Sequence, residues 1–146
     1  MKPEDKELLL KDLCARLPYD VIVSVKDINN FQFDGVLRVI GKNWCRLNIL
    51  DPIKKAKVKN QTIPLNHIYI KPHLRPMSSM TEEERKEYHK LCNIDEEYGV
   101  GGNPVIIAIH DTPESLDYLN SIHVDYRMLI PRDLALSTET FNPYKD

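Results

Sequence analysis

The sequence predicts an α+β fold in which an N-terminal helix and a small five-stranded β-barrel are followed by a mostly helical acidic extension. Hydrophobic residues recur with helical spacing at the start of the chain and then with the two-residue period of β-strands. The balance of charge also reverses, because residues 1–76 carry a net charge of +6 and residues 77–146 a net charge of −8. We therefore place the helix and barrel in residues 1–76 and the extension in residues 77–146, packed on the barrel as one cooperative unit.

The first helix is predicted to begin at Pro3 and to end before Pro18. Proline suits the first turn of a helix, where its missing N–H is not needed, and it stops a helix that it would otherwise interrupt. Leu10, Leu13 and Cys14 follow the i, i+3, i+4 spacing that places side chains on one face. We expect this face to be buried, Cys14 included.

Several β-strands are predicted to follow in quick succession. Residues 21–50 alternate between apolar and polar types and are interrupted by polar turns at 27–30 and 41–43. A weaker strand is expected near 56–59 and a last one over 62–71. Because so many short strands must bury one apolar face, we expect a small barrel or a strongly bent sheet.

The extension is predicted to be helical because it contains helix-start signals. Thr81 and Glu84 have the spacing of a capping box, which predicts a polar helix that runs to about Cys92. Thr112, followed by Pro113, is placed to cap a second helix, and Asp125 is placed to cap a short third one. The apolar run that precedes the second helix is too short to be assigned by its period.

Composition excludes several classes of protein. The chain has 146 residues, 42% of them hydrophobic and 29% charged, which is typical of a globular domain and not of a disordered chain. Its three cysteines are widely spaced, which argues against a disulfide framework or a four-cysteine zinc site. The longest apolar run, 105–109, is far shorter than the ~20 residues of a membrane-spanning helix. Since the first residues also have no leader-type apolar stretch, we expect a cytoplasmic protein that does not enter a membrane.

No catalytic residue, metal site or cofactor is predicted. His89 and Cys92 are spaced to share a helix face, but two ligands do not make a metal site. His110 and His123 flank one predicted helix, which holds them roughly 15 Å apart. The glycine-rich loop 99–102 lacks the lysine of a phosphate-binding loop. We therefore expect a non-enzymatic binding or adaptor protein, with its partner and oligomeric state left open.

The most specific binding signal is a cluster of basic residues around one tryptophan. A solvent-facing aromatic ring among cations suits base stacking combined with phosphate contacts, so the alternative function is weak binding of RNA or single-stranded DNA. The opposing interpretation is that the lysines form a solvated loop and the acidic half covers the tryptophan. The candidate residues are Arg38, Lys42, Trp44, Arg46, Lys54, Lys55, Lys57 and Lys59.

The apolar and glycine pattern of the first half resembles that of small Sm-like and SH3-like β-barrels. The resemblance lies in Val21–Asp27, Phe33–Leu37 and Leu47–Leu50, preceded by the N-terminal helix. It implies the barrel fold. Sm-like domains bind RNA and assemble into rings, and of the aspartate and asparagine in their RNA-contacting loop only Asn43 has a counterpart here.

A second resemblance spans more of the chain. Lys71–Glu84, Leu116–Asn120, His123–Arg127 and Leu134–Leu136 are similar to segments of small uncharacterised proteins from gut-bacterial prophages and other mobile elements. The resemblance implies that a prophage or mobile element encodes the protein and that its partner is another phage or host protein. It implies no particular chemistry.

Overall fold

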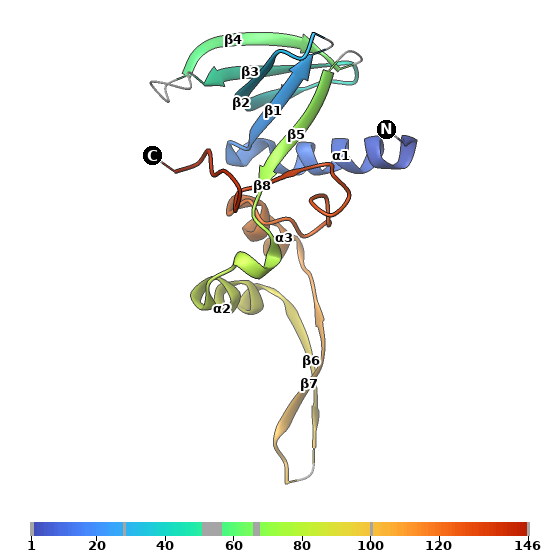
Figure 1. The fold of residues 1–146 in the computed structure, drawn as a ribbon. Helices are drawn as coiled ribbons and strands as arrows, with labels where there is room; N and C mark the ends of the chain where they lie inside the picture. The colour runs from blue at the N-terminus through green and yellow to red at the C-terminus, as the bar shows by residue number, and fades with distance from the viewer. Residues whose placement is uncertain (1, 28, 51–56, 66–67, 100, 146) are drawn as a thin grey trace.

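The computed structural model describes residues 2–27, 29–50, 57–65, 68–99 and 101–145 (Figure 1). Three helices, eight strands and two short 3₁₀ turns lie in these ranges. In chain order they are α1 (Pro3–Arg16), η1 (Leu17–Tyr19), β1 (Ile22–Asp27), β2 (Gln32–Ile40), β3 (Trp44–Leu50), β4 (Lys57–Pro64), β5 (Ile68–Leu74), η3 (Met77–Ser79), α2 (Glu82–Leu91), β6 (Asn93–Tyr98), β7 (Pro104–His110), α3 (Pro113–Ser121) and β8 (Leu136–Ser137).

Helix α1 forms over nearly the predicted residues, but its buried face is rotated from the predicted one. The buried side chains are Leu9, Asp12, Leu13 and Arg16. The expectation that Cys14 is buried is wrong, because its side chain is exposed. Two charged residues thus occupy the inner face of the helix, and an apolar pattern alone cannot reveal them.

The main sheet has the order β4-β3-β2-β1-β5-β8, with β8 parallel to β5 and every other neighbouring pair antiparallel. The predicted α+β class, with a helix before a mostly sheet body, is confirmed. The sheet curves but is not closed into a barrel, because no described residue of β4 pairs with the opposite end of the sheet (Figure 1).

The open sheet buries its apolar face under other elements instead of closing on itself. Leu13 of α1 and Leu129 and Leu134 of the C-terminal segment pack against Val23 and Leu47 on the strands. Because these elements already shield the apolar face from water, burial does not require the two ends of the sheet to meet.

The second half is only partly as predicted. The predicted capping box is present, with the Thr81 hydroxyl accepting from the Glu84 amide at 3.2 Å, and the predicted cap Thr112 accepts from the Ser115 amide at 3.0 Å. The short helix expected after Asp125 is absent, and that segment consists of turns. The unassigned apolar run forms β7, which pairs with β6, so the segment is a mixture of helices and a hairpin.

Helices α2 and α3 form a platform at the end of β5. Its buried apolar cluster consists of Met80, Leu119 and Val124. The Arg75 guanidinium donates to both carboxylate oxygens of Glu84 at 2.8 Å, which fixes α2 to β5. This pairing lowers the pKa of Glu84 to about 2. The platform carries the β6–β7 hairpin, which extends away from the main sheet (Figure 1).

Candidate functional site

Three of the predicted basic-cluster residues form one surface on β3 and the turn before it. We call Lys42, Trp44 and Arg46 the Trp44 surface. Trp44 and Arg46 lie on the side of β3 opposite Cys45 and Leu47, which are fully buried. Trp44 is 39% exposed, and the Arg46 guanidinium lies 5.9 Å from its ring centroid, within cation–π range.

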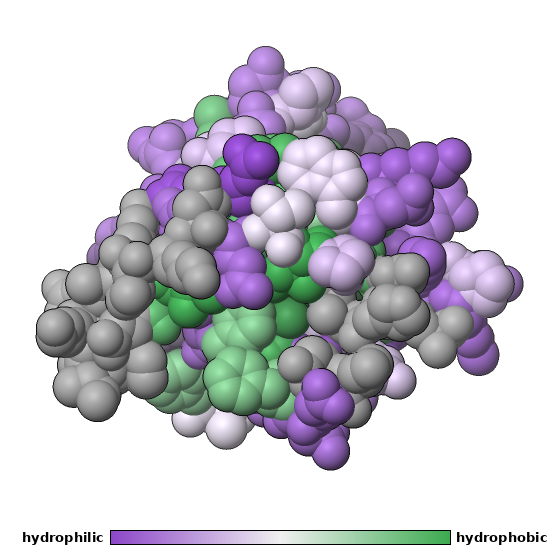
Figure 2. All heavy atoms as spheres, turned by 90° about the horizontal axis from the view of Figure 1, so that it is seen from above, coloured by the Kyte–Doolittle hydropathy of each residue, from purple (hydrophilic) through white to green (hydrophobic). Residues whose placement is uncertain are grey.

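Arg38 is not part of the Trp44 surface. Its guanidinium forms an ion pair with Asp20. Strands β3 and β4 are at the end of the molecule farthest from α2, β6 and β7, which belong to the acidic half (Figure 1). Seen from that end, hydrophobic residues gather in the middle of the face, with hydrophilic residues around them (Figure 2).

The predicted lysines flank this surface in sequence. Lys54 and Lys55 lie outside the described residues. Lys57 and Lys59 belong to β4, where their backbones pair with Leu50 and Ile49 of β3. The structure therefore places three of the eight predicted residues in one described surface.

Sequence reasoning missed the second exposed feature, which is the β6–β7 hairpin. We call residues 93–110 the arm. Three of its cross-strand pairs share one face, here the apolar face: Ile94 with Ile109, Glu96 with Ile106, and Tyr98 with Pro104. The opposite face carries Asn93, Asp95 and Glu97, paired with His110, Ala108 and Val105.

The apolar face of the arm is open to solvent. Ile94 and Ile109 are 36% and 42% exposed near its base, and Ile106 and Tyr98 are 55% and 79% exposed farther out. Large apolar side chains grouped on an exposed face mark interaction sites in soluble proteins, whereas single ones do not. A two-stranded hairpin is also only marginally stable by itself in water.

The arm is fixed at its base. The Thr112 hydroxyl donates to the Leu91 carbonyl at 2.6 Å, and the Tyr88 hydroxyl donates to the Asp111 carboxylate. These bonds join the end of α2 to the start of α3, at the base of the arm where β6 begins and β7 ends. The platform therefore sets the direction in which the arm projects.

The arm is acidic as well as apolar. It contains Asp95, Glu96 and Glu97 and has no lysine or arginine. The Asp95 carboxylate lies 2.8 Å from the His110 ring on the face opposite the apolar one. Glu96 is the one carboxylate on the apolar face, since it pairs across the strands with Ile106.

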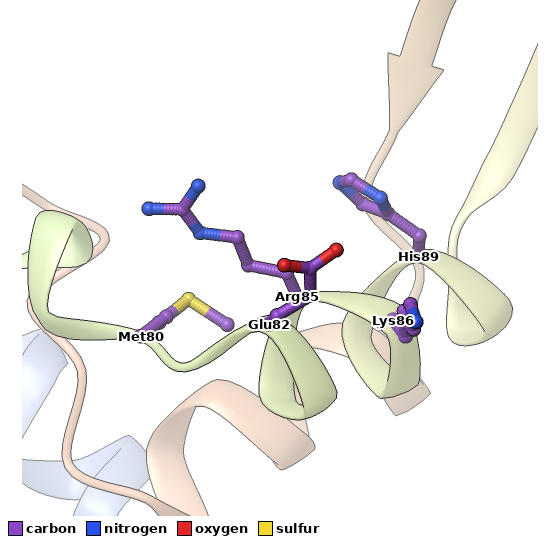
Figure 3. Close-up of a pocket in the computed structure, with 5 residues that line it drawn as sticks. All are labelled: Met80, Glu82, Arg85, Lys86 and His89. Atoms are coloured by element: carbon purple, nitrogen blue, oxygen red, sulfur yellow. The ribbon is translucent and has the colours of Figure 1, made fainter.

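A shallow pocket of about 430 Å³ lies on α2. Glu82, Arg85, Lys86 and His89 line it from one face of the helix, and Met80 lines it from the preceding turn (Figure 3). His89 does not reach a metal-binding set here, because the described residues contain no group of three potential ligands.

A partly buried polar cluster joins the C-terminal tail to the body. The His123 ring stacks on Tyr144 with centroids 4.0 Å apart, and the Tyr144 hydroxyl donates to the His73 carbonyl at 2.9 Å. Burial, with repulsion from Arg16 and Arg75, lowers the pKa of His123 to about 4.

His123 is expected to make stability depend on pH between about 6.5 and about 4. In that range the ring is protonated in the unfolded chain and neutral in the folded protein, so stability falls as pH falls. Replacing His123 with Asn, which tolerates the positive φ of 62° at this position, should flatten this slope. Urea unfolding at several pH values measures it, and an equal slope in both proteins would contradict the assignment.

Comparison with protein-family models, with curated proteins and with solved structures finds no match. None of the described helices is long and apolar enough to cross a membrane. The Trp44 surface and the arm are therefore the features of the molecule that bear on its function.

Proposed function

We propose that this chain is a non-enzymatic binding or adaptor protein that contacts its partner through the apolar face of the arm. The observation that carries the proposal is the exposure of Ile94, Ile106 and Ile109 on one face of a projecting hairpin. Covering such a face removes apolar surface from water, which stabilises a complex by roughly 25 cal/mol per Å² buried. A fixed base supports this role, because an arm already held in place loses little conformational freedom when it binds.

Two neighbouring substitutions test the proposal. Ile106→Lys places a charge on the apolar face, and Val105→Lys places the same charge on the opposite face. The two positions are matched in exposure, since the Val105 side chain is 51% exposed and that of Ile106 is 55% exposed. The tagged protein and both variants are purified from the cells that express the chain, and the retained proteins are quantified by mass spectrometry. We expect a partner that wild type and Val105→Lys retain and Ile106→Lys loses. Equal retention by all three would contradict the proposal.

We also propose that the chain belongs with the small proteins of prophages and mobile elements that it resembles, and that it acts in the cytoplasm. The order β4-β3-β2-β1-β5, with a helix before it, supports a relationship of the sheet to Sm-like or SH3-like small barrels. On this proposal the partner is a phage or host protein.

The second candidate function is binding of single-stranded nucleic acid at the Trp44 surface. The exposed Trp44 ring beside the Arg46 guanidinium favours it, because a base can stack on the ring while the cation contacts a phosphate. Labelled RNA and DNA titrated at low salt test this. A dissociation constant weaker than ~100 μM, or binding unchanged by Trp44→Ala, would contradict it.

A further inference from the structure

We propose that the arm binds a second copy of this chain, docking its apolar face on the Trp44 surface of the neighbour so that the copies associate head to tail. This inference rests on the proposed function, in which the arm is the contact element. Three observations lead to it: the position of the two surfaces, their charges, and the need of the Glu96 carboxylate for a cation or hydrogen-bond donors when it is covered.

The two surfaces lie at opposite ends of the molecule. The Trp44 surface is on β3, and the arm projects from the α2–α3 platform away from the main sheet (Figure 1). Because the platform fixes the arm at its base, the arm does not fold back onto its own sheet. The two surfaces can therefore meet only between copies.

The surfaces are complementary in charge. The docking face of the arm carries the Glu96 carboxylate, the arm has neither lysine nor arginine, and Lys42 and Arg46 are the cations of the Trp44 surface. Both surfaces are also partly apolar, since Trp44 exposes its ring and the arm exposes Ile106 and Tyr98. Opposite charges around an aromatic and aliphatic centre are the arrangement that favours a specific protein contact.

The Glu96 carboxylate limits which surfaces can cover the apolar face of the arm. Glu96 lies on the apolar face, so any surface that covers this face also covers its carboxylate. A covered carboxylate needs a cation or hydrogen-bond donors to replace water. Arg46, beside the Trp44 ring, offers a cation within an aromatic surface. Pairing two arms through their apolar faces would instead cover both Glu96 carboxylates without supplying a lysine or an arginine, because the arm contains neither.

A contact between different surfaces of identical chains has a consequence for assembly. A docked pair keeps one unused Trp44 surface on the first copy and one unused arm on the second, so association continues to a closed ring or an open chain. The assembly should grow with protein concentration and weaken with salt, since part of the attraction is between exposed charges.

The test uses two variants that block opposite ends of the contact. Ile106→Lys blocks the arm, Arg46→Glu blocks the acceptor surface, and Val105→Lys is the matched control. Sedimentation velocity from ~1 to ~200 μM measures the mass. Wild type and Val105→Lys should exceed the 17.0 kDa of one chain as concentration rises, and each blocked variant should remain monomeric.

An equimolar mixture of the two blocked variants is the decisive sample. The intact arm of Arg46→Glu can dock on the intact Trp44 surface of Ile106→Lys, and the complex then has only blocked surfaces left. We expect a species of two chains that does not grow further. Circular dichroism melting checks that the variants fold, and Tyr98→Lys with Lys42→Glu is the second pair if either of the first fails to fold.

Several results would overturn the inference. A wild type that is monomeric throughout, or a mixture that does not associate, excludes head-to-tail docking. If Arg46→Glu associates by itself, the arm docks on a surface other than the Trp44 surface. If a monomer binds RNA at the Trp44 surface, the ligand of that surface is RNA and not the arm. If the chain is monomeric but Ile106→Lys still loses a cellular partner, the inference fails and the proposed function stands.

Discussion

Replacing Asp12 with Ala is expected to lower the free energy of unfolding by about 3–5 kcal/mol, the range for removing one partner of a buried ion pair. Asp12 and Arg16 are both fully buried and are joined by a 2.8 Å bond between the Arg16 Nε and the carboxylate. The other carboxylate oxygen accepts from Arg127 at 2.9 Å. Without Asp12, the Arg16 guanidinium would keep its charge in the interior, with the Val124 carbonyl as a remaining partner at 2.7 Å.

Two further variants separate this effect from a general weakening of α1. Glu7→Ala removes an exposed carboxylate from the same helix and should change stability by less than about 0.5 kcal/mol. The double change Asp12→Leu with Arg16→Met should cost less than Asp12→Ala alone, because it leaves no fully buried charge. Arg127 loses its bond to Asp12 in both variants and keeps some contact with water, since its side chain is 18% exposed. Urea unfolding measures all three. A double variant that is less stable than the single one would contradict the account.

The same cluster ties the two halves of the sequence together. Asp12 and Arg16 belong to α1, and Val124 and Arg127 belong to the C-terminal segment. The pairing of β8 with β5 adds a second connection. These contacts support the prediction that residues 1–76 and 77–146 unfold as one unit, which two separate transitions in calorimetry would contradict.

Local signals in the sequence predicted much of this fold. The proline-bounded first helix, the alternating strands within residues 21–50 and the capping box of Thr81 and Glu84 depend on neighbouring residues, and each appears where the pattern predicts it. The last strand predicted over 62–71 instead divides between the end of β4 and the start of β5. The buried face of α1 was predicted less well. Asp12 and Arg16 are buried because partners from residues 124–127 satisfy them, and a partner more than 100 positions away leaves no trace in a helical period.

The arm shows a different limit of sequence reasoning. The run Val105–Ile109 is continuously apolar, which indicates burial and does not separate strand from helix. Its partner Asn93–Tyr98 is polar enough to be taken for part of a surface helix. The available signal was the turn between them, where Gly101 and Gly102 adopt positive φ values of 88° and 75°. Even a correct hairpin assignment would not have shown that its apolar face is uncovered.

Asp125 has a structural role, as predicted, but it stabilises a loop and not a helix. The sequence suggested a helix cap, but no helix follows it. Its carboxylate instead accepts hydrogen bonds from the Leu129 amide at 2.9 Å and the Ile130 amide at 2.8 Å. These bonds hold together an irregular loop that places Leu129 in the core.

Replacing Asp125 with Ala should therefore lower the free energy of unfolding by about 2–4 kcal/mol, because two backbone N–H groups in a largely buried loop lose their acceptor. This exceeds the ~1 kcal/mol of a typical helix cap. Asp117→Ala, at an exposed position on α3, is the control and should have little effect. The competing account makes Asp125 part of a ligand site and predicts unchanged stability with lost binding. Urea unfolding of the two variants separates the accounts, since a cost near zero for Asp125→Ala is compatible only with the second.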